Sequence, residues 1–87
     1  MRLKTYISTD WIEVHDHDST YLARVFLTDN DEAYMIRKSQ NETRFFRVNP
    51  KLLRLGELGF FEKMMESASE LPIKLAVEFG FIDGKQE

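Results

Sequence analysis

The sequence predicts an α+β fold in which the N-terminal half forms an antiparallel sheet of four or five strands and two or three C-terminal helices pack on one face. Short segments rich in β-branched and aromatic residues follow one another up to residue 48, with turn-forming residues between them. Beyond residue 49 the apolar residues take helical spacing. The chain has 87 residues, the size of one small domain, so residues 1–87 are expected to form a single domain.

The strand prediction comes from composition and from the turns. The expected strands cover residues 3–8, 11–15, 20–28, 33–38 and 43–48. Asp-Asn-Asp and Ser-Gln-Asn separate the last three segments and suit tight turns, so we expect consecutive strands to pair in antiparallel order.

The first helical signals are Asn49 and Pro50, which are typical of a helix cap and a first turn and predict a short helix over 50–55. In the segment 60–68 the apolar residues recur at i, i+3, i+4 and i+7, which predicts an amphipathic helix.

The segment 71–82 fits two structures. Its apolar residues alternate as in a strand, whereas its charged residues have the i, i+4 spacing of a helix. We prefer a helix that ends before Phe81 and Ile82, which would be extended. If the segment is a final strand instead, the alternative fold is a small, partly closed barrel.

Composition excludes several function classes. The chain has no cysteine, so disulfides, thiolate catalysis and thiolate metal sites are absent and an intracellular, cytoplasmic location is expected. No apolar run is long enough for a signal peptide or a spanning helix, so no membrane association is expected. The chain begins with Met and is expected to be a complete small protein, a kind that more often regulates, inhibits or adapts than catalyses.

The charge is unevenly distributed along the chain. Its net value is −3, from 12 Lys and Arg against 15 Asp and Glu. Residues 32–54 hold six basic and two acidic groups, whereas residues 1–31 and 55–87 are both acidic. This asymmetry favours a charged partner.

A binding surface follows if the turns at 28–33 and 38–43 each contain an even number of residues. Cross-strand partners then sum to 61 and to 81, which brings three arginines and three apolar residues to one side of the sheet. These residues are Arg24, Arg37, Arg44, Phe26, Met35 and Phe46.

Two interpretations of these rows stay open. In one, the C-terminal helices cover the apolar row, and acidic residues such as Glu62 or Glu66 neutralise the arginines. In the other, the apolar side chains anchor a partner while the arginines bind its carboxylates or phosphates. Trp11, the only tryptophan, is either an exposed anchor or partly buried core.

A metal site is a weaker hypothesis. Glu13, His15 and His17 share one face if the second strand continues, and two such histidines can chelate a metal. The same residues also fit a polar turn with solvated histidines. No nucleophile, carboxylate pair or glycine loop has a catalytic or cofactor-binding context, so we expect no cofactor.

The sequence therefore predicts a non-catalytic protein-binding module, an adaptor, regulator or inhibitor, whose partner carries an acidic patch. The second hypothesis is a single-stranded nucleic-acid-binding module that uses the same rows, although the pI of about 5.4 argues against it. The third is a metal-dependent activity at His15 and His17. The oligomeric state stays open, because an edge strand or an uncovered sheet face could pair with a second copy.

Overall fold

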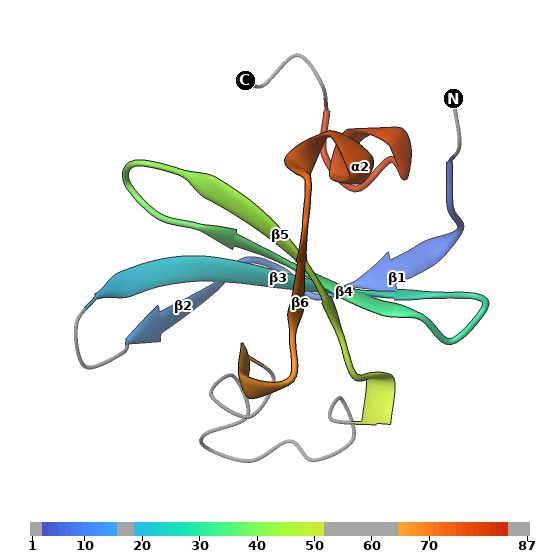
Figure 1. Ribbon diagram of the computed structural model, residues 1–87, viewed down its shortest axis with the longest axis horizontal. Coiled ribbons are helices and arrows are strands. Elements are labelled where there is room, and N and C mark those ends of the chain that lie inside the picture. The colour runs from blue at the N-terminus through green and yellow to red at the C-terminus, as the bar shows by residue number, and fades with distance from the viewer. Residues whose placement is uncertain (1–2, 16–18, 52–64, 84–87) are drawn as a thin grey trace.

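The computed structural model describes residues 3–15, 19–51 and 65–83. Their strands and one helix follow the chain in this order: β1 (Tyr6–Ser8), β2 (Ile12–His15), β3 (Thr20–Thr28), β4 (Ala33–Lys38), β5 (Thr43–Val48), β6 (Ser69–Leu71) and α2 (Ile73–Glu78). The strands form one antiparallel sheet in the order β1-β3-β4-β5-β6, and β2 pairs with the other half of β3 (Figure 1). The five predicted strands are confirmed, and β6 is an addition.

The helical half of the prediction is not supported. The described chain is mostly sheet, with α2 as its one complete helix, so two or three C-terminal helices are not found there. Lys51 N donates to Asn49 Oδ1 at 3.0 Å, which begins a helical turn as the sequence indicated. The predicted helices over 50–55 and 60–68 lie mostly outside the described residues.

The ambiguous C-terminal segment contains a helix, as preferred. Pro72 directly precedes α2, where a missing N–H has no cost. The helix ends at Glu78 and is followed by the cap residue Phe79 and by Gly80, whose φ of +85° suits a residue without a Cβ atom. Gly80 N donates to Val77 O, and Phe81 N donates to Ala76 O, which satisfies the last carbonyls. Figure 1 shows α2 lying beyond the end of β6.

Each face of the sheet carries a hydrophobic core. On the helix face, four sheet residues pack with Ala76 and Phe81: Phe26, Tyr34, Ile36 and Phe45. The opposite face carries a second core, formed by Tyr21, Ala23, Val25, Ala33, Met35, Phe46 and Val48. Met65 and Ala68 pack against this core. Successive residues along β3, such as Val25 and Phe26, and along β4, such as Met35 and Ile36, therefore belong to different cores.

The register between β3 and β4 differs by one residue from the expected one. Val25 pairs with Met35, and Phe26 pairs with Tyr34, so partners sum to 60 instead of 61. The cause is the turn, in which Thr28 N donates to Glu32 O at 2.9 Å and three residues lie between them. Asp31 takes a φ of +61°, as in a type I turn followed by a left-handed residue.

The register between β4 and β5 is as expected. Ser39 N donates to Glu42 O at 2.9 Å, which leaves an even number of residues in the turn. Met35 pairs with Phe46, and Arg37 pairs with Arg44. The register prediction was therefore right for one turn and wrong for the other.

Candidate functional site on the edge formed by β1 and β2

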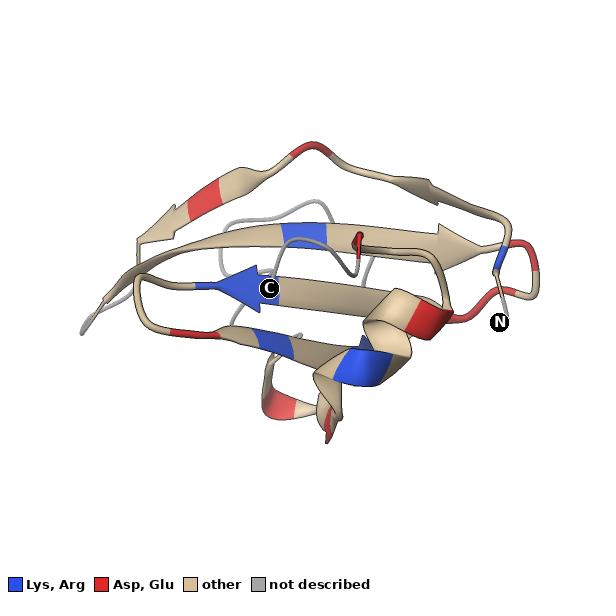
Figure 2. Cartoon of the chain, turned by 90° about the horizontal axis from the view of Figure 1, so that it is seen from above, with Lys and Arg blue, Asp and Glu red and all other residues tan. Residues whose placement is uncertain are grey.

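The predicted row of three arginines does not form. Arg37 and Arg44 are direct cross-strand partners, but Arg24 pairs with Ile36 and lies on the helix face. The basic positions of the described chain are spread over separate elements (Figure 2). The one-residue change in the β3–β4 register accounts for this correction, because it moves every side chain of β3 to the other face.

The predicted apolar row is not available to a partner. Phe26 and Met35 are fully buried, and Phe46 is 4% exposed. Phe26 lies on the helix face and stacks on Phe81, with 4.5 Å between the ring centroids, whereas Met35 and Phe46 lie in the core of the opposite face. These three residues are divided between the two cores, so they do not form one exposed row.

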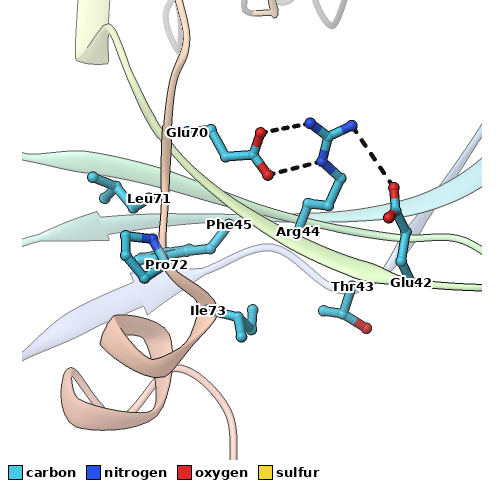
Figure 3. Close-up of a pocket in the computed structure, with 8 residues that line it drawn as sticks. All are labelled: Glu42, Thr43, Arg44, Phe45, Glu70, Leu71, Pro72 and Ile73. Carbon is cyan, nitrogen blue, oxygen red and sulfur yellow. Dashed lines mark hydrogen bonds and ion pairs between the residues drawn. The ribbon is translucent and has the colours of Figure 1, made fainter.

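Arg44 binds carboxylates of its own chain. Its Nε donates to Glu70 Oε2 at 2.8 Å, its Nη2 donates to the other oxygen of Glu70, and its Nη1 lies 3.7 Å from Glu42 Oε1 (Figure 3). The hydrogen bonds to Glu70 raise the pKa of Arg44 and lower that of Glu70. Arg44 is thus neutralised within its own chain, and the carboxylate that does so belongs to Glu70 of β6. The sequence had suggested Glu62 or Glu66 for this role.

The other two arginines also contact their own chain. Arg37 lies over the ring of Tyr21, 4.0 Å from its centroid. Arg24 Nε donates to Thr9 O at 3.0 Å, and its Nη2 donates to Ser8 Oγ at 3.0 Å. Arg24 therefore ties the edge strand to β3.

An open groove lies between β5, β6 and the start of α2. It has a volume of about 510 Å³, and the Arg44–Glu70 ion pair stands on one side of it while Leu71, Pro72 and Ile73 line the other (Figure 3). Since the guanidinium is already bound by two carboxylates, the groove offers an incoming ligand little free charge.

The exposed apolar side chains point to a different site. Among the described residues, five large apolar side chains are exposed: Leu3 (71%), Ile7 (72%), Trp11 (40%), Ile12 (37%) and Leu22 (38%). Ile7, Trp11 and Ile12 belong to the segment that forms β1, β2 and the bend between them, and we call these three side chains the edge surface. Trp11 was a candidate from the sequence; Ile7 and Ile12 were not.

The bend in this edge comes from a bulge at residues 9–11. Ser8 pairs with Phe26 and Ile12 pairs with Ala23, so three residues on the edge oppose two on β3. Thr9 begins the bulge: its N donates to Val25 O, while its Oγ1 accepts from Val25 N at 3.1 Å. The Thr9 hydroxyl takes the place of the Thr9 carbonyl as the acceptor for Val25 N, because that carbonyl accepts a hydrogen bond from Arg24 Nε instead.

The bulge places Ile7 and Ile12 on one side of the sheet. Ile7 pairs with Leu27 and Ile12 pairs with Ala23, and both partners contribute to the core of the opposite face. The two partners are four positions apart on β3, so Ile7 and Ile12 lie about 13 Å apart. Without the extra residue, the side chains of Ile12 and Val14 would lie on the helix face.

The edge also has backbone groups directed away from the sheet. Thr9 N donates to Val25 O, and Asp29 N donates to Thr5 O. Hydrogen-bonded pairs alternate in an antiparallel ladder, so Ile7 is bonded to Leu27, and the backbone groups of Tyr6 and Ser8 point outward.

The histidine hypothesis receives no support from the described residues. His15 Nε2 lies 3.1 Å from Glu13 Oε1, and its Nδ1 lies 3.2 Å from Thr20 Oγ1. His17 lies outside the described residues. Within the described ranges no group of three or more His, Cys, Asp or Glu side chains could hold a metal ion.

Comparison with protein families, curated proteins and solved structures finds no match to this chain. None of the described residues belongs to a helix that is long and apolar enough to span a bilayer.

Proposed function

We propose that this protein is a non-catalytic protein-binding module, an adaptor, regulator or inhibitor, that contacts its partner through the edge surface. The observation that carries the proposal is the exposure of Ile7, Trp11 and Ile12 on one sheet edge, whereas the large apolar side chains at the centre of the sheet lie in two cores. An edge strand with exposed apolar side chains is a place where another chain can add to a sheet.

The charged residues near the edge surface indicate which charge a partner should carry. Asp10 and Glu13 are the charged residues between Thr5 and Val14, and the first lies within the bulge. An extended segment with apolar side chains and a basic flank therefore complements this edge. This replaces the acidic partner expected from the sequence, which depended on a row of arginines.

The nucleic-acid alternative loses the residues on which it depended. Base stacking needs exposed rings, and Phe26 and Phe46 are buried. A titration with single-stranded oligonucleotides at two salt concentrations checks this point. Salt-sensitive binding that Arg37→Ala and Arg44→Ala abolish would favour nucleic acid over the protein partner.

The proposal is tested by affinity capture with matched variants of the immobilised protein. Trp11→Ala removes the side chain most typical of a binding hot spot, and Ile12→Ser removes its neighbour. Loss of a hot spot costs about 2 kcal/mol, which is about thirtyfold in the dissociation constant. Leu22→Ser is the control, because Leu22 is equally exposed but pairs with Glu13 and Lys38, on the helix face.

The expected result is a set of proteins retained by the wild type and by Leu22→Ser but lost from both edge variants. If the edge variants retain the same proteins as the wild type, the edge surface is not the contact and the proposal is wrong. Circular dichroism of each variant ensures that a loss does not reflect unfolding.

A further inference from the structure

We propose that the partner of β1 is a second copy of this chain, paired antiparallel about a two-fold axis so that the two sheets join. The inference rests on the proposed role of the edge as a docking surface and identifies its occupant. A two-fold interface requires one stretch of surface to complement itself, and β1 meets this requirement in its backbone and its side chains.

The backbone requirement concerns Tyr6 and Ser8. Their N–H and C=O groups point away from β3, because the ladder bonds on this strand are made by Thr5, Ile7 and Thr9. If Tyr6 of one copy lies opposite Ser8 of the other, each such pair exchanges two hydrogen bonds. The two-fold axis produces this pair twice, so every outward backbone group of β1 is satisfied.

The side-chain requirement concerns Ile7. In this register Ile7 of one copy lies directly opposite Ile7 of the other, in a non-hydrogen-bonded pair whose Cβ atoms approach to about 5 Å. Ile7 is the most exposed of the large apolar side chains, at 72%. Pairing buries it against an identical side chain at the centre of the contact, where apolar anchors contribute most.

Charge does not oppose this pairing. Tyr6, Ile7 and Ser8 carry no charge, so the paired stretch buries no ionised side chain. At one end of β1, the Lys4 ammonium group lies 3.3 Å from Glu32 of its own chain and over the Phe79 ring. At the other end, Asp10 lies within the bulge, outside the paired stretch.

The same strand limits the assembly to two copies. Lys4 N donates to Phe79 O at 3.0 Å, which closes the free edge on one side, and the bulge at Thr9 interrupts it on the other. On β1, this leaves the stretch Tyr6–Ser8 for pairing. Because the contact is isologous, it closes on itself and does not propagate into a filament.

Sedimentation velocity of the full chain, from about 5 µM to about 1 mM, tests the inference. A strand of three residues gives an interface at the low end of the usual sizes, so we expect dissociation in the micromolar to submillimolar range. Ser8→Pro removes an outward N–H without breaking the ladder to β3, and Ile7→Lys places like charges opposite each other. Each variant should raise the dissociation constant about tenfold or more.

Ser8→Ala is the matched control, because it removes the contact between Ser8 Oγ and Arg24 but keeps the backbone N–H. Its dissociation constant should equal that of the wild type. A wild type that stays monomeric throughout, a Ser8→Pro variant that dimerises normally, or species that grow beyond a dimer would each overturn the inference.

The failure of this inference is distinguishable from failure of the proposed function. A monomeric wild type whose captured proteins are still lost from Trp11→Ala and Ile12→Ser overturns the dimer alone. Unchanged capture by those variants overturns the proposed function, whatever the oligomeric state.

Discussion

Exchanging Phe26, Phe46 and Phe81 for leucine, singly and in pairs, tests on which face of the sheet Phe26 lies. The rings of Phe26 and Phe81 are stacked, with an interplanar angle of 20° and centroids 4.5 Å apart. Each single exchange should cost about 1–2 kcal/mol of unfolding free energy. The total for a domain of this size is about 4–13 kcal/mol, so the variants should fold.

The informative quantity is the coupling between pairs of exchanges. Phe26 and Phe81 share the core on the helix face, so their double variant should show a coupling energy of about 0.5–1.5 kcal/mol. Phe26 and Phe46 lie on opposite faces of the sheet, so their effects should add within about 0.5 kcal/mol.

The measurement is urea denaturation followed by circular dichroism, with equal slopes required for a comparison of free energies. Thermal midpoints should fall by about 4–8 °C per kcal/mol. The register described here would be refuted by a coupling of about 1 kcal/mol between Phe26 and Phe46 together with additivity between Phe26 and Phe81. That pattern belongs to the register in which Phe26 and Phe46 share a face.

Three further predictions concern titratable and hydrogen-bonding groups. Arg44 lowers the pKa of Glu70. The Glu70 carboxylate therefore stabilises the fold above its unfolded pKa of about 4.3, and this stabilisation is lost as the pH falls through the lower pKa of the folded state. The difference in melting temperature between wild type and Glu70→Gln should be present at neutral pH and vanish in acid. Burial raises the pKa of Tyr34 above the ordinary tyrosine value of 10.0. Absorbance titration should therefore show that Tyr34→Phe removes a phenol that ionises late, and wild-type stability should fall as the pH rises above 10.0. Thr9→Val leaves the N–H of Val25 without its acceptor and should cost about 1–2 kcal/mol in urea denaturation, whereas Thr9→Ser should be nearly neutral.

The strands could be predicted from sequence because local signals determine them. β-branched and aromatic residues between polar turns located β3, β4 and β5 with the bounds found in the structure. The strand β6 could not be found, because the three residues Ser69–Leu71 have no alternating pattern and owe their conformation to pairing with β5. The apolar residues that alternate after position 71 include Ile73, Leu75 and Phe79, which pack against the core on the helix face. Their spacing therefore comes from burial around α2 and not from a strand.

The binding surface was harder to predict because it depends on the number of residues in one turn. Asp29, Asn30 and Asp31 form a three-residue loop, and composition does not distinguish it from a loop of two or four residues. The edge surface needed knowledge of sheet order. Ile7 and Ile12 look like ordinary core residues in the sequence, and only their position at an edge exposes them. Trp11 was recognisable as a candidate because it is the only tryptophan.

The turn between β3 and β4 has a consequence for how this gene can change over generations. Sliding β3 by one position against β4 would exchange the surroundings of Val25 and Phe26 and disrupt both cores. A deletion or insertion between Thr28 and Ala33 must therefore be absorbed within the loop itself, whereas most substitutions in the turn leave the pairing unchanged. Descendants of this sequence should therefore vary the turn in composition but keep its length, with Asp, Asn or Gly retained at position 31 because its φ is positive.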